Sequence, residues 1–222
     1  EAEQEIIFIK DTLGLDGGEL ILDLCCGSGR HALPLAALGC RVVGLDYSPA
    51  LLRIARQETP PHAEWPRYVR ADVRNIPFRN GVFDAALNLF TSFGYFDDDA
   101  NRGVLVSLSR LLRTGGKYCI DYLNPSRVLS SLEPESVRER DGVIIREERS
   151  HNAPARRVEK TIRFQHEGRV REFHESVRLY SLEEMNGMLR GTGLTVEGVY
   201  GSTAGDLYGV SSPRMILWGK KL

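Results

Sequence analysis

Ile21-Leu-Asp-Leu-Cys-Cys-Gly27-Ser-Gly29-Arg-His-Ala32 is the stretch that decides the fold of this chain. It reads as an apolar strand that carries Asp23 near its end, runs into a glycine turn and continues as a helix. Glycine is needed in such a turn where a ligand must approach the backbone with no side chain in the way. The stretch therefore predicts a ligand-binding turn after the first strand of an α/β sheet.

Strand and helix signals alternate on both sides of this turn, which is typical of a parallel sheet covered on both faces. Strands are expected at 20–25, 41–46, 68–71, 83–89 and 117–123. Helices are expected at 5–15, 29–38 and 97–113, and one begins at Ser48-Pro49, with Ser as the N-cap. The first helix is expected to bury Ile6, Ile7, Ile9 and Leu13.

Residues 125–180 have a different pattern, with apolar and polar residues alternating along Val158–Phe164 and Phe173–Leu179 around a Glu167-Gly168 turn. We expect an inserted antiparallel hairpin, with Val143–Arg149 as a third strand. Helical order returns at the capping box that begins at Ser181, and two strands finish the chain. The expected fold is a Rossmann-like doubly wound sheet with an antiparallel terminal strand, formed by 1–124 and 181–222, plus the inserted β segment 125–180.

Composition excludes several classes of protein. The 222 residues carry 29 basic and 30 acidic side chains, a formal charge of −1, so nucleic acid is not an expected partner. No apolar run approaches the roughly 20 residues that cross a bilayer. The acidic start, Glu1 to Glu5, lacks the basic region of a secretory signal. Four cysteines without a CxxC pair indicate reduced thiols, which favours a cytoplasmic location.

Gly27-x-Gly29-x-x-Ala32 also fits the dinucleotide fingerprint, so the kind of ligand needs further argument. Asp23 places a negative charge just before the turn, where it repels a pyrophosphate and favours an ammonium group. A further acid, Asp72, ends the third strand. The chain also ends with a strand pair rather than another parallel βαβ unit. These features argue against a nicotinamide nucleotide.

The sequence resembles the class I S-adenosylmethionine (SAM)-dependent methyltransferases. Five stretches match in the order of that family: Leu22-Asp-Leu-Cys-Cys-Gly-Ser-Gly29, Val43-Gly-Leu-Asp-Tyr-Ser48, Ala71-Asp-Val73, Phe83-Asp-Ala-Ala-Leu87 and Leu111-Leu-Arg-Thr-Gly-Gly116. Together they cover roughly residues 18–124. Cys25 departs from the family, which more often has glycine there, and cysteine does not adopt a positive φ without cost.

The resemblance implies SAM as cofactor, S-adenosylhomocysteine as its product, and a set of cofactor-binding residues. Gly27 and Gly29 would let the backbone pass close to the cofactor, and Asp23 would favour its ammonium group. Asp46 would accept from both ribose hydroxyls, and Asp72 would accept from the adenine amino group, with the Val73 amide nearby. Arg30 either pairs with the cofactor carboxylate or is solvated. The expected cofactor contacts are Asp23, Cys25, Gly27, Gly29, Asp46, Tyr47, Asp72, Val73, Asn88 and Leu89.

The acceptor is expected to be a small molecule, methylated at nitrogen rather than oxygen or carbon. The segment after the fourth strand, Asn88 to Phe96, has no Asp/Asn-Pro-Pro-Tyr/Phe loop of DNA amino-methyltransferases and resembles small-molecule N-methyltransferases. The insertion would form a lid over the acceptor. Candidate catalytic or substrate-side residues are Tyr95, Tyr122 and His174. The three histidines of the insertion lack a metal-binding spacing, so no metal site is expected.

Two other functions stay open at this point. A nicotinamide-dependent oxidoreductase would use the same glycine turn, although Asp23 argues against it. A non-catalytic SAM-binding regulator would keep the cofactor-binding residues but would not catalyse methyl transfer. No local pattern of the sequence identifies the acceptor, the number of methyl groups transferred or the oligomeric state.

Overall fold

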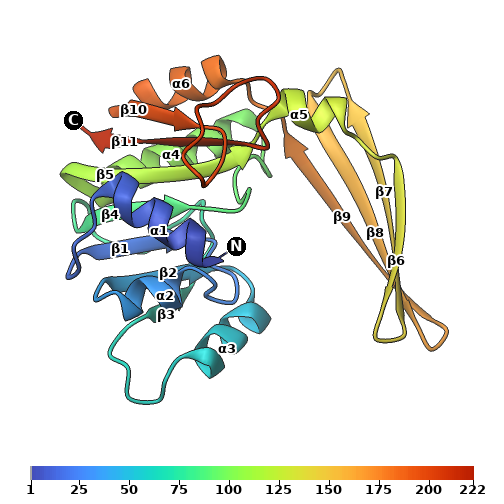
Figure 1. Ribbon diagram of the computed structural model, residues 1–222, viewed down its shortest axis with the longest axis horizontal. Coiled ribbons are helices and arrows are strands. Elements are labelled where there is room, and N and C mark those ends of the chain that lie inside the picture. Colours follow the sequence, from blue (N-terminus) through green and yellow to red (C-terminus); the bar gives the residue numbers. More distant parts are fainter. Residues whose placement is uncertain (1) are drawn as a thin grey trace.

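The computed structural model describes residues 2–222, with side chains from Gln4 onward, and contains two β-sheets (Figure 1). The larger sheet has seven strands in the order β10-β11-β5-β4-β1-β2-β3. Their bounds are β1 Leu20–Leu24, β2 Arg41–Asp46, β3 Arg67–Arg70, β4 Phe83–Asn88, β5 Leu112–Leu123, β10 Leu194–Tyr200 and β11 Arg214–Lys221. β1 to β5 pair in parallel, whereas β11 runs antiparallel to both β5 and β10. The expected Rossmann-like architecture with an antiparallel end is confirmed.

Helices cover both faces of this sheet because the central strands are apolar on both sides. On one face Ile21 packs with α1 (Ala2–Leu13) and α2 (Ala32–Ala37). On the other face Leu22 packs with α4 (Asp98–Leu111) and α6 (Leu182–Arg190). α3 (Pro49–Glu58) lies against β2 and β3. The sheet is therefore the centre of two hydrophobic cores.

One detail of α1 differs from the prediction. Ile6, Ile9 and Leu13 are buried as expected, but Ile7 is 53% exposed. Residues spaced by three and four share one face of a helix, and each successive residue is turned by about 100°. Ile7 therefore lies outside the stripe that Ile6, Ile9 and Leu13 form.

The inserted segment forms a second, four-stranded antiparallel sheet in the order β6-β7-β8-β9. It follows α5 (Pro125–Ser130), and its strands are β6 Glu135–Arg140, β7 Val143–Asn152, β8 Arg157–His166 and β9 Arg169–Arg178. Figure 1 shows this sheet projecting to one side of the larger one. β6 was not predicted because its sequence, ESVRER, is exposed at nearly every position and has no apolar alternation.

Among residues 2–222, no helix combines the length and apolar character that crossing a bilayer requires.

Candidate active site

The glycine turn between β1 and α2 lies beside the end of β2. The Cys26 amide donates to the Leu45 carbonyl at 3.0 Å, and the Gly27 amide donates to Oδ2 of Asp46 at 2.9 Å. Gly27 has φ +56°, and a Cβ built there would meet no atom within 4 Å. The turn thus leaves open space above its backbone, as a ligand-binding turn requires.

Gly29 has a different reason to be glycine. A Cβ at this position would lie 2.6 Å from the hydroxyl of Tyr68 and 3.3 Å from Cβ of Ala55. Because its φ is +83°, an L side chain would also be strained. The packing of Tyr68 and α3 against the turn therefore explains Gly29 without reference to a ligand.

Cys25 adopts the left-handed backbone conformation, with φ +59°. A residue with a Cβ holds this conformation at a cost of roughly 1–2 kcal/mol, so the turn at Cys25 is strained. Burial, followed by the charges of Asp46, Asp23 and Asp72, raises the pKa of the Cys25 thiol to about 12. The side chain is therefore a neutral thiol at physiological pH.

Asp46 organises two loops at the end of β2. Its Oδ2 accepts from the Gly27 amide at 2.9 Å, and its Oδ1 accepts from the Ser48 amide at 2.8 Å. Each carboxylate oxygen has a second lone pair, so the group is positioned by the backbone and can still accept from a ligand.

Asp23 and Asn88 are buried polar groups at the same edge of the sheet. Asp23 is 1% exposed, and Asn88 ends β4 opposite Leu24 of β1. Within the part of the chain that the structure describes, Oδ2 of Asp23 and both side-chain atoms of Asn88 have no hydrogen-bond partner. Burial, and then the charge of Asp46, raises the pKa of Asp23 to about 7. Buried polar groups without partners are rare, and these atoms are suited to bind a polar ligand.

The other expected cofactor residues are placed as follows. Asp72 follows β3, and its carboxylate is bound by the Arg74 guanidinium at 2.6 Å, which together with the Arg74 amide lowers the Asp72 pKa. Val73 and Leu89 are buried. Tyr47 is exposed, and the Arg70 guanidinium lies 5.6 Å from the centre of its ring. A ligand at Asp72 would compete with Arg74.

Arg30 is paired with an acidic side chain and is not a solvated surface arginine. Its guanidinium binds the Glu5 carboxylate of α1 at 2.8 Å, and His31 contacts the same carboxylate at 2.9 Å. The guanidinium also lies 5.1 Å from the centre of the Phe90 ring. Arg30 therefore connects α1 to the loop after β4.

A cavity of about 690 Å³ lies between that loop and the inserted sheet. The loop contributes Phe90, Thr91 and Tyr95, and the sheet contributes side chains of β7, β8 and β9. The full lining is Phe90, Thr91, Tyr95, Leu123, Val128, Ser131, Leu132, Glu133, Arg149, Val158, Lys160, Glu175 and Val177. Its size suits a small organic molecule.

The turn Phe90-Thr91 has two successive left-handed residues, with φ +55° and +59°. Asp121 of β5 accepts from the Phe90 amide at 3.1 Å and is bound by both Nε and Nη2 of Arg214 at 2.7 Å. Nη2 of Arg214 also donates to the Thr91 hydroxyl at 3.0 Å. The ion pair between β5 and β11 thus holds this strained turn at the cavity wall.

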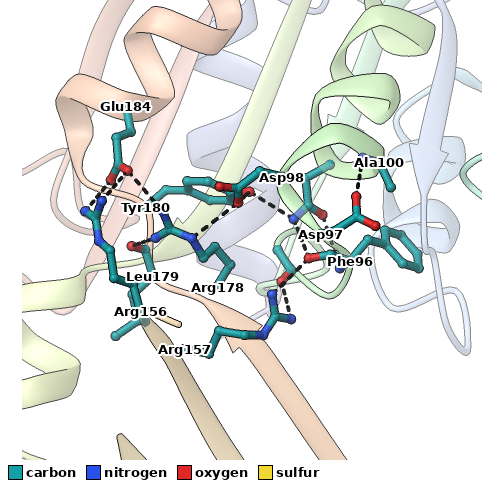
Figure 2. Close-up of polar contacts among 12 residues, drawn as sticks. Phe96, Asp97, Asp98, Ala100, Arg156, Arg157, Arg178, Leu179, Tyr180 and Glu184 are labelled. Carbon is teal, nitrogen blue, oxygen red and sulfur yellow. Dashed lines mark hydrogen bonds and ion pairs between the residues drawn. The ribbon is translucent and has the colours of Figure 1, made fainter. Parts of the chain in front are cut away.

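Arg157 ties the inserted sheet to the segment that carries Tyr95 (Figure 2). Its guanidinium donates to the carbonyls of Phe96 at 2.9 Å, Tyr95 at 3.1 Å and Gly94 at 3.2 Å. Nearby, Arg178 binds Asp98 of α4 and Glu184 of α6, each at 3.2 Å. These arginines fix the end of the inserted sheet against the helices of the larger one.

The three catalytic candidates do not lie together. Tyr95 lines the cavity. Tyr122 is fully buried, donates its hydroxyl proton to the Arg178 carbonyl and packs against Phe93, so its ring serves the core. His174 contacts Thr161 and Glu172 on the opposite face of β9 from the cavity residues Glu175 and Val177. Of the three candidates, Tyr95 is the one that lines the cavity.

Within residues 2–222, no group of three or more His, Cys, Asp or Glu side chains is arranged to hold a metal ion. The cavity residues Lys160 and Arg149 were not identified from the sequence, and Glu175 was noted only as one of the polar residues of the insertion. The available signal was the period-two alternation, which places Glu175 on the same face as Val177.

Comparisons with known proteins agree with this geometry. Residues 21–116 match the family described as "Methyltransferase domain". An uncharacterized methyltransferase of Synechocystis sp. is 31% identical over 120 residues, 54% of each chain. The Cypemycin N-terminal methyltransferase of Streptomyces sp. is 27% identical over 217 residues, 96% of this chain and 86% of that protein. This chain spans about half the length, or less, of most curated relatives that it matches.

The CcbJ methyltransferase of Streptomyces caelestis has the same fold, with a TM-score of 0.86 and 20% sequence identity over 99% of this chain and 89% of that one. The parallel sheet and the glycine turn at the carboxyl end of β1 give the chain a Rossmann-like fold. Residues 21–116 are thus similar to a methyltransferase domain, and the chain as a whole shares the fold of a solved methyltransferase.

Proposed function

We propose that this protein transfers a methyl group from SAM to an amine nitrogen of a small molecule. The observation that carries the proposal is the position of the cavity. It begins at Phe90 and Thr91, directly after the strand that ends with the unpartnered Asn88, and it is closed on the far side by the inserted sheet. We also propose that residues 125–180 act as the acceptor-side wall.

The residues at the carboxyl edge fit SAM. Asp23 offers a buried carboxyl group to an ammonium group, and Asp46 offers free lone pairs to a vicinal diol. Gly27 leaves its backbone open. Asn88 has an unpartnered amide at the edge nearest the cavity. When bound, SAM would supply an electrophilic methyl group on a cationic sulfur.

The chain's own contribution is alignment and exclusion of water. The Asp121–Arg214 pair holds Phe90 and Thr91, and Arg157 holds Tyr95, so the cavity wall is preorganised. A nitrogen acceptor must be unprotonated when it attacks, so a proton has to leave it first. The carboxylates of the cavity are suitable sites for that proton.

Two observations support nitrogen as the atom that accepts the methyl group. One is the pair of carboxylates, Glu133 and Glu175, in the cavity lining. The other is the relative that covers nearly the whole chain, which is named as an N-terminal methyltransferase and therefore acts on an amine.

The proposal is tested in two stages. Isothermal titration with S-adenosylhomocysteine is expected to give micromolar binding, a common range for cofactor sites. Transfer from methyl-labelled SAM is then measured for small primary and secondary amines, amino sugars and short peptides, each beside its hydroxyl analogue. Amines are expected to be labelled and hydroxyl analogues not.

Asp46→Ala is expected to weaken S-adenosylhomocysteine binding roughly 30-fold or more, because two backbone amides and the ligand lose a charged acceptor. Asp11→Ala, on the exposed surface of α1, is the control and should bind as the parent protein does. If the parent protein does not bind S-adenosylhomocysteine, the proposal that SAM is the cofactor is rejected. If only hydroxyl analogues are labelled, the proposal that nitrogen is the acceptor atom is rejected.

A further inference from the structure

Glu175 lies between Phe173 and Val177 on the inner face of β9. Because side chains alternate along a strand, Phe173, Glu175 and Val177 share one face, and Glu175 and Val177 both line the cavity. Glu172 and His174 share the opposite face, where Glu172 binds Arg163 of β8. The two carboxylates are three residues apart on one strand and face different surroundings.

The two bases of the cavity already have a carboxylate partner. Glu147 of β7 is 3% exposed, and it binds the Arg149 guanidinium and, at 3.1 Å, the Lys160 ammonium group. Burial alone would raise the pKa of Glu147, but Lys160, Arg149 and Arg138 lower it, so it is ionised. Arg149 also donates to the Ser136 hydroxyl at 3.1 Å. Both bases of the cavity are thus already paired with a carboxylate that lies outside the cavity lining.

The Glu175 carboxylate is less engaged. In the described residues its nearest cation is Lys160, whose Nζ is 4.0 Å away and closer to Glu147. The cavity lining holds two acids, Glu133 and Glu175, and two bases, Arg149 and Lys160. Both bases contact Glu147, which lies outside the lining, at shorter distances than Lys160 keeps to Glu175. A cation that binds Glu175 therefore displaces no close ion pair.

An aromatic ring stands beside this carboxylate. Tyr95 lines the same cavity, and burial, followed by the nearby Glu175 charge, raises the pKa of its hydroxyl. No arginine of the described chain lies over the Tyr95 ring, whereas Arg30 and Arg214 both lie over Phe90. A carboxylate next to an open aromatic face is a favourable site for an organic cation.

We propose that the acceptor enters the cavity as a cation and that its ammonium group binds Glu175 beside the ring of Tyr95. This proposal rests on the proposed function and narrows it to amines that are protonated before they react. It makes Glu175 the residue that selects the charge of the acceptor. Neutral amides and anionic molecules of equal size are then poor ligands.

The test uses three probes of one shape: benzylammonium, benzyl alcohol and benzoate. Their affinities are measured by ligand-observed NMR on the full chain with saturating S-adenosylhomocysteine. Benzylammonium is expected to bind at least tenfold more tightly than the other two. Glu175→Gln is expected to abolish this preference, and Glu172→Gln, the matched carboxylate on the outer face, to leave it within twofold.

Each outcome decides the proposal. Equal binding of the three probes by the parent protein, stronger binding of benzoate, or an unchanged preference in Glu175→Gln overturns it. Folding of each variant is checked by its S-adenosylhomocysteine affinity, and Glu175→Asp, which keeps the charge, is expected to keep part of the preference. If the parent protein does not bind S-adenosylhomocysteine, the proposed function fails. If it binds but shows no charge preference, only this inference fails.

Discussion

The two sheets of this protein are stabilised in different ways. In the seven-stranded sheet, β1, β4 and β5 have helices on both sides, and residues such as Leu22 and Ile120 are completely buried. In the inserted sheet, the outer face carries a ladder of charges, in which Arg163 contacts Glu148 and Glu172. Its inner face is partly open, and Phe173 is 52% exposed. Burial of apolar area is therefore the main stabilising contribution in the seven-stranded sheet. The inserted sheet is stabilised mainly by its junction with the helices.

The largest expected effect tests this difference directly. Leu22→Ala should lower the free energy of unfolding by about 3–5 kcal/mol, because it removes a buried side chain and leaves a cavity. Phe173→Ala should cost less than about 1 kcal/mol, since half of that ring is in solvent. Urea denaturation of both variants gives the comparison. Equal costs would mean that the inner face of the inserted sheet is a second core.

A pH-dependent effect is expected at Asp23. Its pKa is raised from 3.8 to about 7, so the folded state holds the proton more tightly than the unfolded state does. The contribution of Asp23 to stability is therefore fully present below about pH 4 and is lost as pH rises through about 7, a change of up to about 4 kcal/mol. Asp23→Asn should remove most of this slope and weaken S-adenosylhomocysteine binding at least tenfold. Urea denaturation of both proteins at pH 4.5 and 7.5 measures the pH dependence of stability.

An unchanged slope in Asp23→Asn would contradict the burial of an unpartnered carboxyl group there. Asp84→Asn is the comparison within the same sheet, since Asp84 is paired with Arg113 at 2.9 Å.

The junction between the sheets is tested at Arg157. Lysine cannot supply the planar fork that reaches three carbonyls, so Arg157→Lys should loosen residues 94–96. Hydrogen exchange of the amides in that segment is expected to rise about tenfold, while S-adenosylhomocysteine affinity stays within twofold. Arg163→Lys, on the outer ladder of the same strand, is the control and should leave that segment unchanged. A large loss of cofactor affinity instead would show that the two sheets do not act separately.

The smallest effect is expected at Cys25. Cys25→Gly relieves a left-handed cysteine but adds freedom to the unfolded chain, so the net gain in stability is about 0.5 kcal/mol. Cofactor affinity should change less than about threefold. Thermal denaturation measures the gain, and a net loss would indicate that the thiol contributes packing that glycine lacks.

Local patterns predicted the elements that local forces determine. The strand 41–46, the Ser48 N-cap and the Ser181 capping box are all confirmed, because each depends on neighbours within a few residues. β6 was missed because its partner β7, not its own sequence, makes it a strand. The Asp121–Arg214 pair joins residues 93 apart in the sequence, and such a pair leaves no pattern in either neighbourhood.

The amino-acid sequence by itself determined the order of the elements, the glycine turn and the acids at the ends of the first three strands. Periodicity and turn chemistry are properties of short segments, and they are readable without the fold. Only the tertiary structure decided that Tyr122 belongs to the core, that His174 faces away from the cavity and that Glu175 faces into it. These outcomes depend on how the inserted sheet docks, through Arg157 and Arg178, on residues roughly 60 to 80 positions earlier in the chain.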